Sequence, residues 1–253
     1  MKIIHTGATG MVGEGVLIEC IAHPQIEEIL IVSRKPSGYT DPKIKEYIVP
    51  EFLNLANDDE HLRGYDAVLF CSGISSAGMK EDEYTRITYD TTMHFATIFL
   101  QLNPDSIFCF VSGAHTDGTG EGKTMWARVK GKTENALKQL AFKHQYNFRP
   151  GLMKVTAGQK NVHGLNRVIK HVNPLFGLFI PVVTLKEVGL AMINCALYGY
   201  PKNVLEVEDL KIASALTGEI KSDEAKADET KVDEAKIDEA KIDEAKPDEA
   251  AST

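Results

Sequence analysis

Cysteine is scarce in this sequence, and its placement argues against both disulfides and metal centres. The four cysteines lie far apart, no two share a C-x-x-C spacing, and each falls in a segment typical of buried helix or strand: Cys20, Cys71, Cys109 and Cys195. They are therefore interpreted as reduced thiols of the core. The eight histidines also lack the spacing of metal ligands, so no metal site is predicted.

Long apolar runs are also missing. The chain passes from Met1 straight into an apolar strand, without the charged and apolar regions of a secretory signal. The most apolar stretch, residues 174–184, is too short to cross a bilayer and contains Pro181. These features predict a cytoplasmic protein that does not bind membranes.

The sequence has no excess of positive charge. Residues 219–253 hold thirteen acids and six lysines, which accounts for −7 of the net charge of −8. The remaining chain carries 22 basic and 23 acidic residues and is nearly neutral. A nucleic-acid partner is therefore not predicted, because it would require a basic surface.

The acidic end of the chain is a repeat. K-x-D-E-A occurs six times from Lys221, once with Thr in place of Ala. A five-residue period cannot keep the variable position on one helix face, and each Glu meets an Asp four residues later. We expect residues 219–253 to form a disordered or transiently helical tail that is solvated, with a partner-binding arm as the alternative.

The first 218 residues alternate between strand-like and helix-like segments. This order predicts an α/β fold, a Rossmann-type doubly wound parallel sheet, with a small substrate-side lobe formed by residues 151–218. Strands are expected at 2–5, 28–33, 45–49, 66–71, 106–112 and 146–148, with a short one from 204. Helices are expected at 81–102, 125–144, 160–171 and 185–198, with one more before residue 216.

A glycine-rich motif follows the first predicted strand. Residues 6–13 read T-G-A-T-G-M-V-G, and a helix is expected to begin near Met11. Glycines permit a tight turn and close approach to a pyrophosphate, which the helix N-terminus would bind. No Lys-Ser or Lys-Thr pair follows, which disfavours a nucleoside-triphosphate loop. The predicted cofactor contacts are Gly7, Thr9, Gly10, Met11, Val12 and Gly13; the alternative is a glycine turn without a ligand.

The end of the second predicted strand indicates which dinucleotide binds. Ser33 is followed by Arg34 and Lys35, where NAD-selecting enzymes carry an acid for the ribose hydroxyls. Two cations suit a 2′-phosphate, so NADP(H) is the preferred cofactor and NAD(H) remains possible. The alternative is a pair of solvated surface cations.

Further motifs extend this pattern in the order C-S-G (71–73), V-S-G-A (111–114), V-K-G-K-T-E (129–134) and F-R-P-G (148–151). With them, residues 1–218 resemble the short-chain dehydrogenase/reductase (SDR) superfamily in its atypical, epimerase/dehydratase-like branch. The run M-W-A-R-V-K-G-K-T-E-N is most similar to the Tat-interacting oxidoreductase-like subgroup and its bacterial relatives. The resemblance implies additional cofactor contacts at Cys71, Ser72, Gly73, Lys130, Pro150 and Gly151, with Arg149 leading into the last two.

The resemblance also implies a catalytic set of Ser, Tyr and Lys, with Tyr four residues before Lys. Ser112 and Lys130 match two of its members, but Trp126 stands at the tyrosine position. An indole N–H only donates and cannot act as an acid near neutral pH. The candidates for a replacement proton donor are Tyr84, Tyr89, His115 and a water held by Ser112.

The loop between Ser112 and the next helix is rich in glycine. Residues 113–124 are therefore expected to be a mobile loop that closes over the substrate. Within this loop, His115 and Asp117 form a possible pair of base and orienting acid.

Two functions follow from these features. The first is an NADP(H)-dependent oxidoreductase or isomerase acting on a small carbonyl or alcohol without the usual tyrosine. The second is a non-catalytic NADP(H)-binding module, regulatory or redox-sensing, that acts through a protein partner. The presence of Ser112 and Lys130 favours the first, and the absence of tyrosine at position 126 favours the second.

Overall fold

The structure is a computed structural model of the chain, and it describes residues 1–162 and 182–218. The chain divides into two units, Met1–Thr217 and Gly218–Thr253. The description below concerns the first unit. The predicted repeat tail, residues 219–253, lies outside the described residues.

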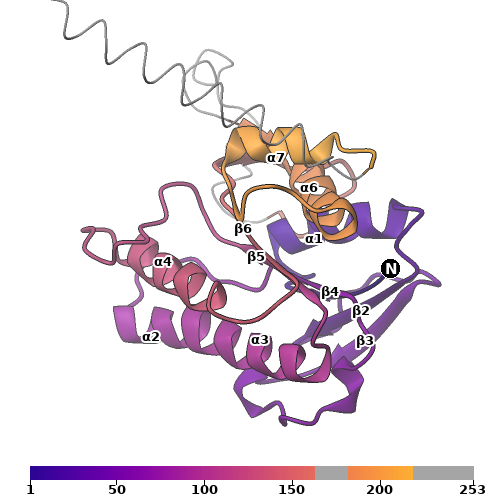
Figure 1. Ribbon diagram of the computed structural model, residues 1–253, viewed down its shortest axis with the longest axis horizontal. Helices are drawn as coiled ribbons and strands as arrows, with labels where there is room; N and C mark the ends of the chain where they lie inside the picture. Colours follow the sequence, from indigo (N-terminus) through magenta and orange to yellow (C-terminus); the bar gives the residue numbers. More distant parts are fainter. Residues whose placement is uncertain (163–181, 219–253) are drawn as a thin grey trace, which may run out of the picture. The chain divides into compact units, whose positions relative to one another are not determined.

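A seven-stranded parallel sheet forms the centre of the first unit (Figure 1). Its strand order is β3-β2-β1-β4-β5-β6-β9, so the chain builds outward from β1 in both directions. The strands are β1 (Lys2–Thr6), β2 (Glu28–Ser33), β3 (Ile44–Ile48), β4 (Ala67–Phe70), β5 (Ile107–Val111), β6 (His144–Phe148) and β9 (Val204–Leu205). This sheet confirms the predicted Rossmann-type fold.

Helices cover both faces of the sheet (Figure 1). On one side lie α2 (Glu81–Thr85), the π-helical turn Arg86–Asp90, α3 (Thr91–Leu102) and α4 (Met125–Leu137). On the other side lie α1 (Met11–Ala22), α6 (Leu185–Tyr198) and α7 (Val207–Ser214). Short 3-10 turns occur at Phe52–Asn54 and Glu60–Leu62, and a separate two-stranded parallel sheet pairs β7 (Leu152–Lys154) with β8 (Val182–Thr184).

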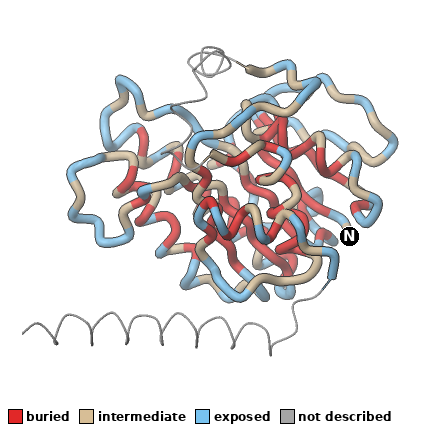
Figure 2. Tube along the Cα trace, turned by 90° about the horizontal axis from the view of Figure 1, so that it is seen from above, coloured by how far each residue is buried: buried red, intermediate tan, exposed pale blue. Residues whose placement is uncertain are grey.

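The central strands are apolar on both faces, which is why their sequences are nearly continuous apolar runs. Alternate residues enter two different cores: Leu69 and Cys109 pack with α1 and α6, whereas Phe70 and Phe108 pack with α3. Figure 2 shows this buried interior beneath exposed connecting loops.

The structure corrects the end of one predicted helix and leaves most of another outside the described residues. The helix expected at 125–144 ends at Leu137, because β6 already begins at His144 and the chain must turn between them. The helix expected at 160–171 does not begin at residues 160–162, and the rest of it lies outside the described residues. The helix expected at 81–102 is continuous except for the π-helical turn in its middle.

The C-terminal part of the described chain is built into the main body. The helix α6 begins with a capping box in which Thr184 and Glu187 each accept a hydrogen bond from the other's backbone N–H. It packs along α1, where a Cβ atom at Gly15 would lie 2.7 Å from Leu185 Cβ. In residues 1–162 and 182–218, no helix is long and apolar enough to span a bilayer.

Candidate functional site

The turn between β1 and α1 is as compact as the glycine motif predicts. Gly7 adopts a φ of +78°, and a Cβ atom there would lie 2.6 Å from the backbone of Cys71 at the end of β4. A Cβ atom at Gly13 would lie only 2.1 Å from the Gly7 carbonyl oxygen. The Gly10 N–H donates to that same oxygen at 2.9 Å. Glycine is therefore required at positions 7 and 13 by the fold itself.

The N-terminus of α1 is left open by this turn. Its N-cap residue, Gly10, provides no side chain to accept a hydrogen bond. Within the described part of the chain, the N–H groups of Met11, Val12 and Gly13 have no hydrogen-bond partner. Free N–H groups and the positive end of the helix dipole suit an anion, and the exposed position of Gly10 permits close approach. The donor set therefore fits the pyrophosphate of a dinucleotide.

A buried histidine on β1 forms a hydrogen bond with the glycine turn. His5 lies on β1 with no exposed surface, and its Nε2 is 2.8 Å from the Gly13 carbonyl oxygen. Its other nitrogen, Nδ1, has no partner among the described residues. Burial lowers the pKa of His5 to about 4, and the hydrogen bond to Gly13 offsets this only in part. Neutral His5 thus donates from Nε2 and fixes the first turn of α1.

Acid is expected to destabilise the protein through His5. Its pKa is about 4 when folded and 6.5 in the reference state, so the unfolded chain binds the proton more readily between these values. The free energy of unfolding should fall by about 3 kcal/mol as the pH drops through this window. Denaturant melts of His5→Gln should lack this contribution, whereas the exposed His115→Gln should keep it. An unchanged pH slope in His5→Gln would refute the assignment.

The predicted cations follow β2 as expected. Arg34 and Lys35 are exposed, and neither forms an ion pair with any residue in the described ranges. The Ser33 hydroxyl donates to the Lys35 carbonyl oxygen at 2.7 Å, which fixes the turn that carries them. Two exposed cations thus stand at the carboxyl end of β2, on the same sheet edge as the glycine turn.

The end of β4 meets the glycine turn directly. The Ser72 N–H donates to the Thr6 hydroxyl at 3.1 Å, and Gly73 has open space where a Cβ atom would lie. Burial raises the pKa of the Cys71 thiol, so Cys71 is a protonated wall residue rather than a nucleophile. Parallel strands bring all these carboxyl ends to one edge of the sheet.

The structure brings Lys130 and Trp126 to the carboxyl end of β5. The Lys130 Nζ donates to the carbonyl oxygens of Val111 and Ser112 at 3.1 and 3.2 Å. The ring of Trp126, one helical turn earlier on α4, lies 3.4 Å from the position of a Cβ atom at Gly113. Burial lowers the pKa of Lys130 to about 8, while the charge of Glu134 acts in the opposite direction. The three predicted catalytic residues are thus neighbours in space.

The Ser112 hydroxyl is engaged within the loop that follows β5. Its Oγ is 3.0 Å from the Thr116 hydroxyl, which itself donates to the Gly113 carbonyl oxygen at 2.7 Å. Ser112 is therefore the donor to Thr116, and its side chain is almost completely buried. In this arrangement Ser112 can accept a hydrogen bond but does not have its proton free.

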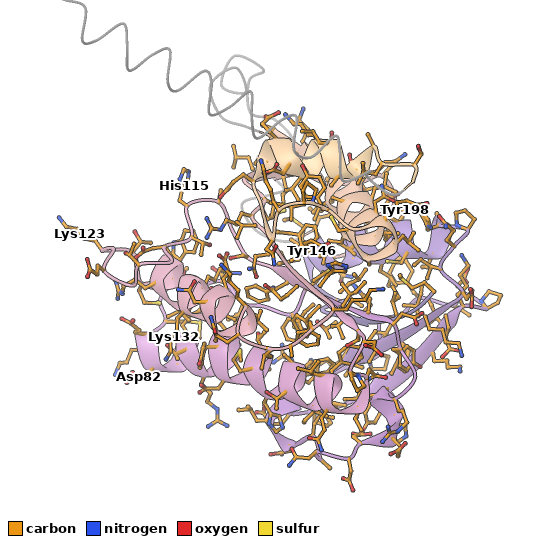
Figure 3. All side chains as sticks on the ribbon, in the orientation of Figure 1. Asp82, His115, Lys123, Lys132, Tyr146 and Tyr198 are labelled. Carbon is orange, nitrogen blue, oxygen red and sulfur yellow. The ribbon has the colours of Figure 1, made fainter. Side chains whose placement is uncertain are left out.

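The three side-chain candidates for a replacement proton donor lie in different environments. Tyr84 is buried in the helical layer, and burial raises its pKa. Tyr89 lies beneath Lys132, whose Nζ is 4.2 Å from its ring centroid. His115 is exposed on the loop and points to solvent (Figure 3). The fourth candidate, a water held by Ser112, stays a prediction.

The proposed pair of His115 and Asp117 is not formed. The Asp117 carboxylate instead accepts hydrogen bonds from both the N–H and the hydroxyl of Thr119 and from the Gly122 N–H. The reason is local geometry: an aspartate readily closes a turn with the backbone that follows it. His115 meanwhile adopts a φ of +64° and turns outward.

The loop 113–124 is fastened to α4 rather than left free. The Asp117 N–H donates to the Ala127 carbonyl oxygen at 3.1 Å, and Arg128 donates to the Gly122 carbonyl oxygen at 2.6 Å. Close approach is possible because α4 has Gly131 at this point, where a Cβ atom would lie 1.8 Å from the Asp117 carbonyl oxygen. Closure of this loop over a substrate stays a prediction, and these contacts oppose it.

The F-R-P-G segment lies beside the end of β5. The Ala114 N–H donates to the Pro150 carbonyl oxygen at 3.1 Å, which places Pro150 and Gly151 next to the Ser112 loop. Arg149 points elsewhere, to the Glu134 carboxylate of α4, with its two hydrogen bonds at 2.6 and 3.0 Å. This nearly buried ion pair makes Arg149 a structural residue.

Two residues of the site had no distinguishing signal in the sequence. His5 was one histidine among eight, and Glu14 was an acid in the first turn of a helix, where acids are common. Their importance depends on contacts with residues distant in sequence. In residues 1–162 and 182–218, no three His, Cys, Asp or Glu side chains are arranged to hold a metal ion.

No family model matches the sequence. Two proteins with detectable similarity are fungal. The Leucinostatins biosynthesis cluster protein T of Purpureocillium lilacinum is 31% identical over 144 residues, which cover 55% of this chain and 52% of that protein. The mitochondrial protein fmp52-1 of Aspergillus terreus is 24% identical over 156 residues, covering 59% of this chain and 66% of that protein. The match thus spans half to two thirds of these relatives.

Several solved structures share this fold, and two of them contain a bound UDP-sugar. The UDP-N-acetylglucosamine 4-epimerase of Methanobrevibacter ruminantium has a TM-score of 0.58 at 16% identity, over 80% of this chain and 74% of that one. MoeE5, solved with UDP-glucuronic acid and NAD, has a TM-score of 0.61 at 15% identity, over 81% and 75%. The chain therefore has the Rossmann-type fold that is also found in NAD-binding epimerases and dehydratases.

Proposed function

We propose that this chain is an NADP(H)-binding protein of the atypical SDR type. The observation that carries the proposal is the open N-terminus of α1, where Met11, Val12 and Gly13 present N–H groups without partners in the described part of the chain. The fold and the NAD bound by structural neighbours such as MoeE5 support a nicotinamide dinucleotide as the anion. The M-W-A-R-V-K-G-K-T-E-N run supports the Tat-interacting oxidoreductase-like subgroup.

NADPH is expected to bind more tightly than NADH, because Arg34 and Lys35 can donate to the 2′-phosphate. Calorimetric titration of Arg34→Ala should show this preference reduced by about 1.5 to 3 kcal/mol, the contribution of a charged hydrogen bond. Arg86→Ala is the matched control, since Arg86 is exposed on the π-helical turn and has no ion pair within the described ranges. Equal affinity of the unmodified protein for both dinucleotides at moderate salt would disprove the preference.

The proposed activity is oxidation–reduction or isomerisation of a small carbonyl or alcohol compound. When bound, the nicotinamide ring supplies the hydride chemistry. Lys130, which stands at the end of β5 beside Ser112, would bind the nicotinamide ribose with the N–H that it does not donate to carbonyl oxygens. Trp126 would form a flat wall for the ring or the substrate.

The test is NADPH oxidation by the purified chain with a panel of carbonyl compounds. Because structural neighbours bind UDP-sugars, the panel should include oxidised nucleotide sugars beside simple ketones and aldehydes. Turnover of one compound would establish the activity. Cytoplasmic location is a further proposal, which cell fractionation would test; two fungal relatives have names that include "mitochondrial".

A second candidate is a non-catalytic NADP(H)-binding module that acts through a protein partner. Two observations favour it: Trp126 replaces the acid, and the Ser112 proton is donated to Thr116. This candidate predicts tight NADPH binding without NADPH oxidation by any member of the panel. It also predicts a partner whose affinity changes with NADPH concentration, measurable by titrating the partner with and without cofactor.

A further inference from the structure

A buried carboxylate on the first turn of α1 joins segments that are distant in sequence. Glu14 has no exposed surface. Its carboxylate accepts hydrogen bonds from the Tyr39 hydroxyl at 2.7 Å and from the backbone N–H groups of Lys160 and Asn161 at 2.8 and 2.7 Å. Tyr39 follows β2, whereas the other two follow β7. Glu14 therefore fastens both segments to the helix that starts at the glycine turn.

These contacts are strong because the carboxylate is charged. Burial alone would favour the protonated form, but the hydrogen bonds from Lys160, Tyr39 and Asn161 outweigh it and hold the pKa of Glu14 below its ordinary value. A buried anion keeps its donors, since losing one would leave charge without compensation. The segment 156–161 is thus held in place by an ionised group.

A second contact fixes the same segment at the start of α1. The Gln159 side chain donates from Nε2 to the Met11 carbonyl oxygen at 2.7 Å and accepts from the Thr156 N–H, also at 2.7 Å. The segment therefore lies against the first turn of α1, the turn that carries the unpartnered N–H groups.

This placement brings a cation to the segment that follows β2. The Lys160 Nζ is 4.7 Å from the ring centroid of Tyr39, a cation–π contact. Lys160 is exposed and, in the part of the chain that the structure describes, has no carboxylate partner for its ammonium.

We propose that Lys160 is a specificity-determining residue for the 2′-phosphate of NADP(H), and that Glu14 is the positioning residue that places it. Arg34 and Lys35 would approach the phosphate from the end of β2, and Lys160 from the segment 156–161, where its ammonium contacts the Tyr39 ring. A phosphate dianion is well compensated by cations from two sides. The inference rests on the proposed function, NADP(H) binding.

The first test separates the 2′-phosphate from the rest of the cofactor. The full chain is titrated with 2′,5′-ADP and with 5′-AMP, which differ in that phosphate alone. Lys160→Ala is expected to lower the affinity for 2′,5′-ADP about tenfold, because one charged hydrogen bond is lost. The affinity for 5′-AMP should stay the same. Lys154→Ala is the matched control, since Lys154 is an exposed lysine on β7. It should change neither affinity.

The second test addresses positioning by Glu14. In Glu14→Gln a single carboxamide oxygen cannot satisfy all the donors, so Lys160 should be released and 2′,5′-ADP affinity should fall about as far as in Lys160→Ala. The double variant should discriminate between 2′,5′-ADP and 5′-AMP as well as each single variant does. The reason is that both substitutions remove the same interaction, so their effects do not add. If the role of Glu14 were purely structural, Glu14→Gln would instead lower the affinity for both probes equally. Its effect on 2′,5′-ADP affinity would then add to the effect of Lys160→Ala.

The possible failures can be told apart. If the unmodified chain binds 2′,5′-ADP no better than 5′-AMP, the proposed NADP(H) function fails and this inference fails with it. If the unmodified chain discriminates and Lys160→Ala discriminates equally well, the inference alone is overturned. Lys160 is exposed, so its replacement leaves the fold intact and the result can be interpreted even where Glu14→Gln does not fold.

Discussion

A Trp126→Tyr variant is expected to gain NADPH-dependent carbonyl reduction, or to increase it by about 10² to 10⁴, the usual contribution of general acid catalysis. The indole of Trp126 lies against Gly113 at the end of β5, and Lys130 stands one helical turn later with its ammonium at the same strand end. A tyrosine hydroxyl would be introduced beside a positive charge that lowers its pKa. The measurement is the rate of NADPH oxidation with the carbonyl panel.

Two controls decide whether the residue is correctly placed. Trp126 is the single tryptophan of the chain, so its fluorescence should fall when NADPH binds beside it. Lys130→Ala should weaken NADPH binding, because the ribose would lose its ammonium partner. The placement is wrong if saturating NADPH leaves the fluorescence unchanged and Lys130→Ala binds NADPH like the unmodified chain. Phe in place of Trp126 provides a ring without an acid and should not gain activity.

Alanine substitutions at two glycines of the turn are expected to have different effects. In Gly13→Ala the new Cβ atom would lie 2.1 Å from the Gly7 carbonyl oxygen, so backbone must move. The expected cost is about 1 to 3 kcal/mol of unfolding free energy, together with loss of NADPH binding. In Gly10→Ala the nearest atom is 3.4 Å away, so the fold should be retained.

The function of Gly10 then becomes measurable. Its backbone would lie closest to the pyrophosphate. A methyl group at this position should keep the pyrophosphate from a backbone N–H donor and lower the affinity for NADPH at least about tenfold, through the loss of a charged hydrogen bond. Thermal melting and calorimetric titration of both variants separate the two effects. Gly10→Ala that binds NADPH normally would contradict the placement of the pyrophosphate at this turn.

Much of the fold could be predicted because its signals are local. β2 was expected at 28–33 and occupies Glu28–Ser33, since a continuous apolar run of that length is typical of a strand covered on both faces. The helix at 185–198 was also predicted at its observed bounds, Leu185–Tyr198. The end of α4 was not, because helical composition continues past Leu137 and the turn into β6 depends on where that strand pairs with β5.

The residues of the candidate site divide in the same way. The glycine turn and the cations after β2 follow from local motifs of the chain, and the Ser112, Trp126 and Lys130 positions follow from the resemblance to the SDR superfamily. The His115 and Asp117 pair was wrong, because the Asp117 carboxylate closes its own turn instead. Spacing describes which groups are near in sequence, but side-chain direction within a loop depends on the surrounding hydrogen bonds.

The sequence by itself determined the parallel α/β architecture, the position of the glycine turn between β1 and α1, and the presence of the single tryptophan four residues before Lys130, since strand periodicity, glycine spacing and residue identity are local properties. Only the tertiary structure decided that His5 supports the Gly13 carbonyl and that Glu14 collects donors from segments 25 and 146 residues away along the chain. The physical reason is that a buried polar group needs partners, and folding chooses them from distant parts of the chain.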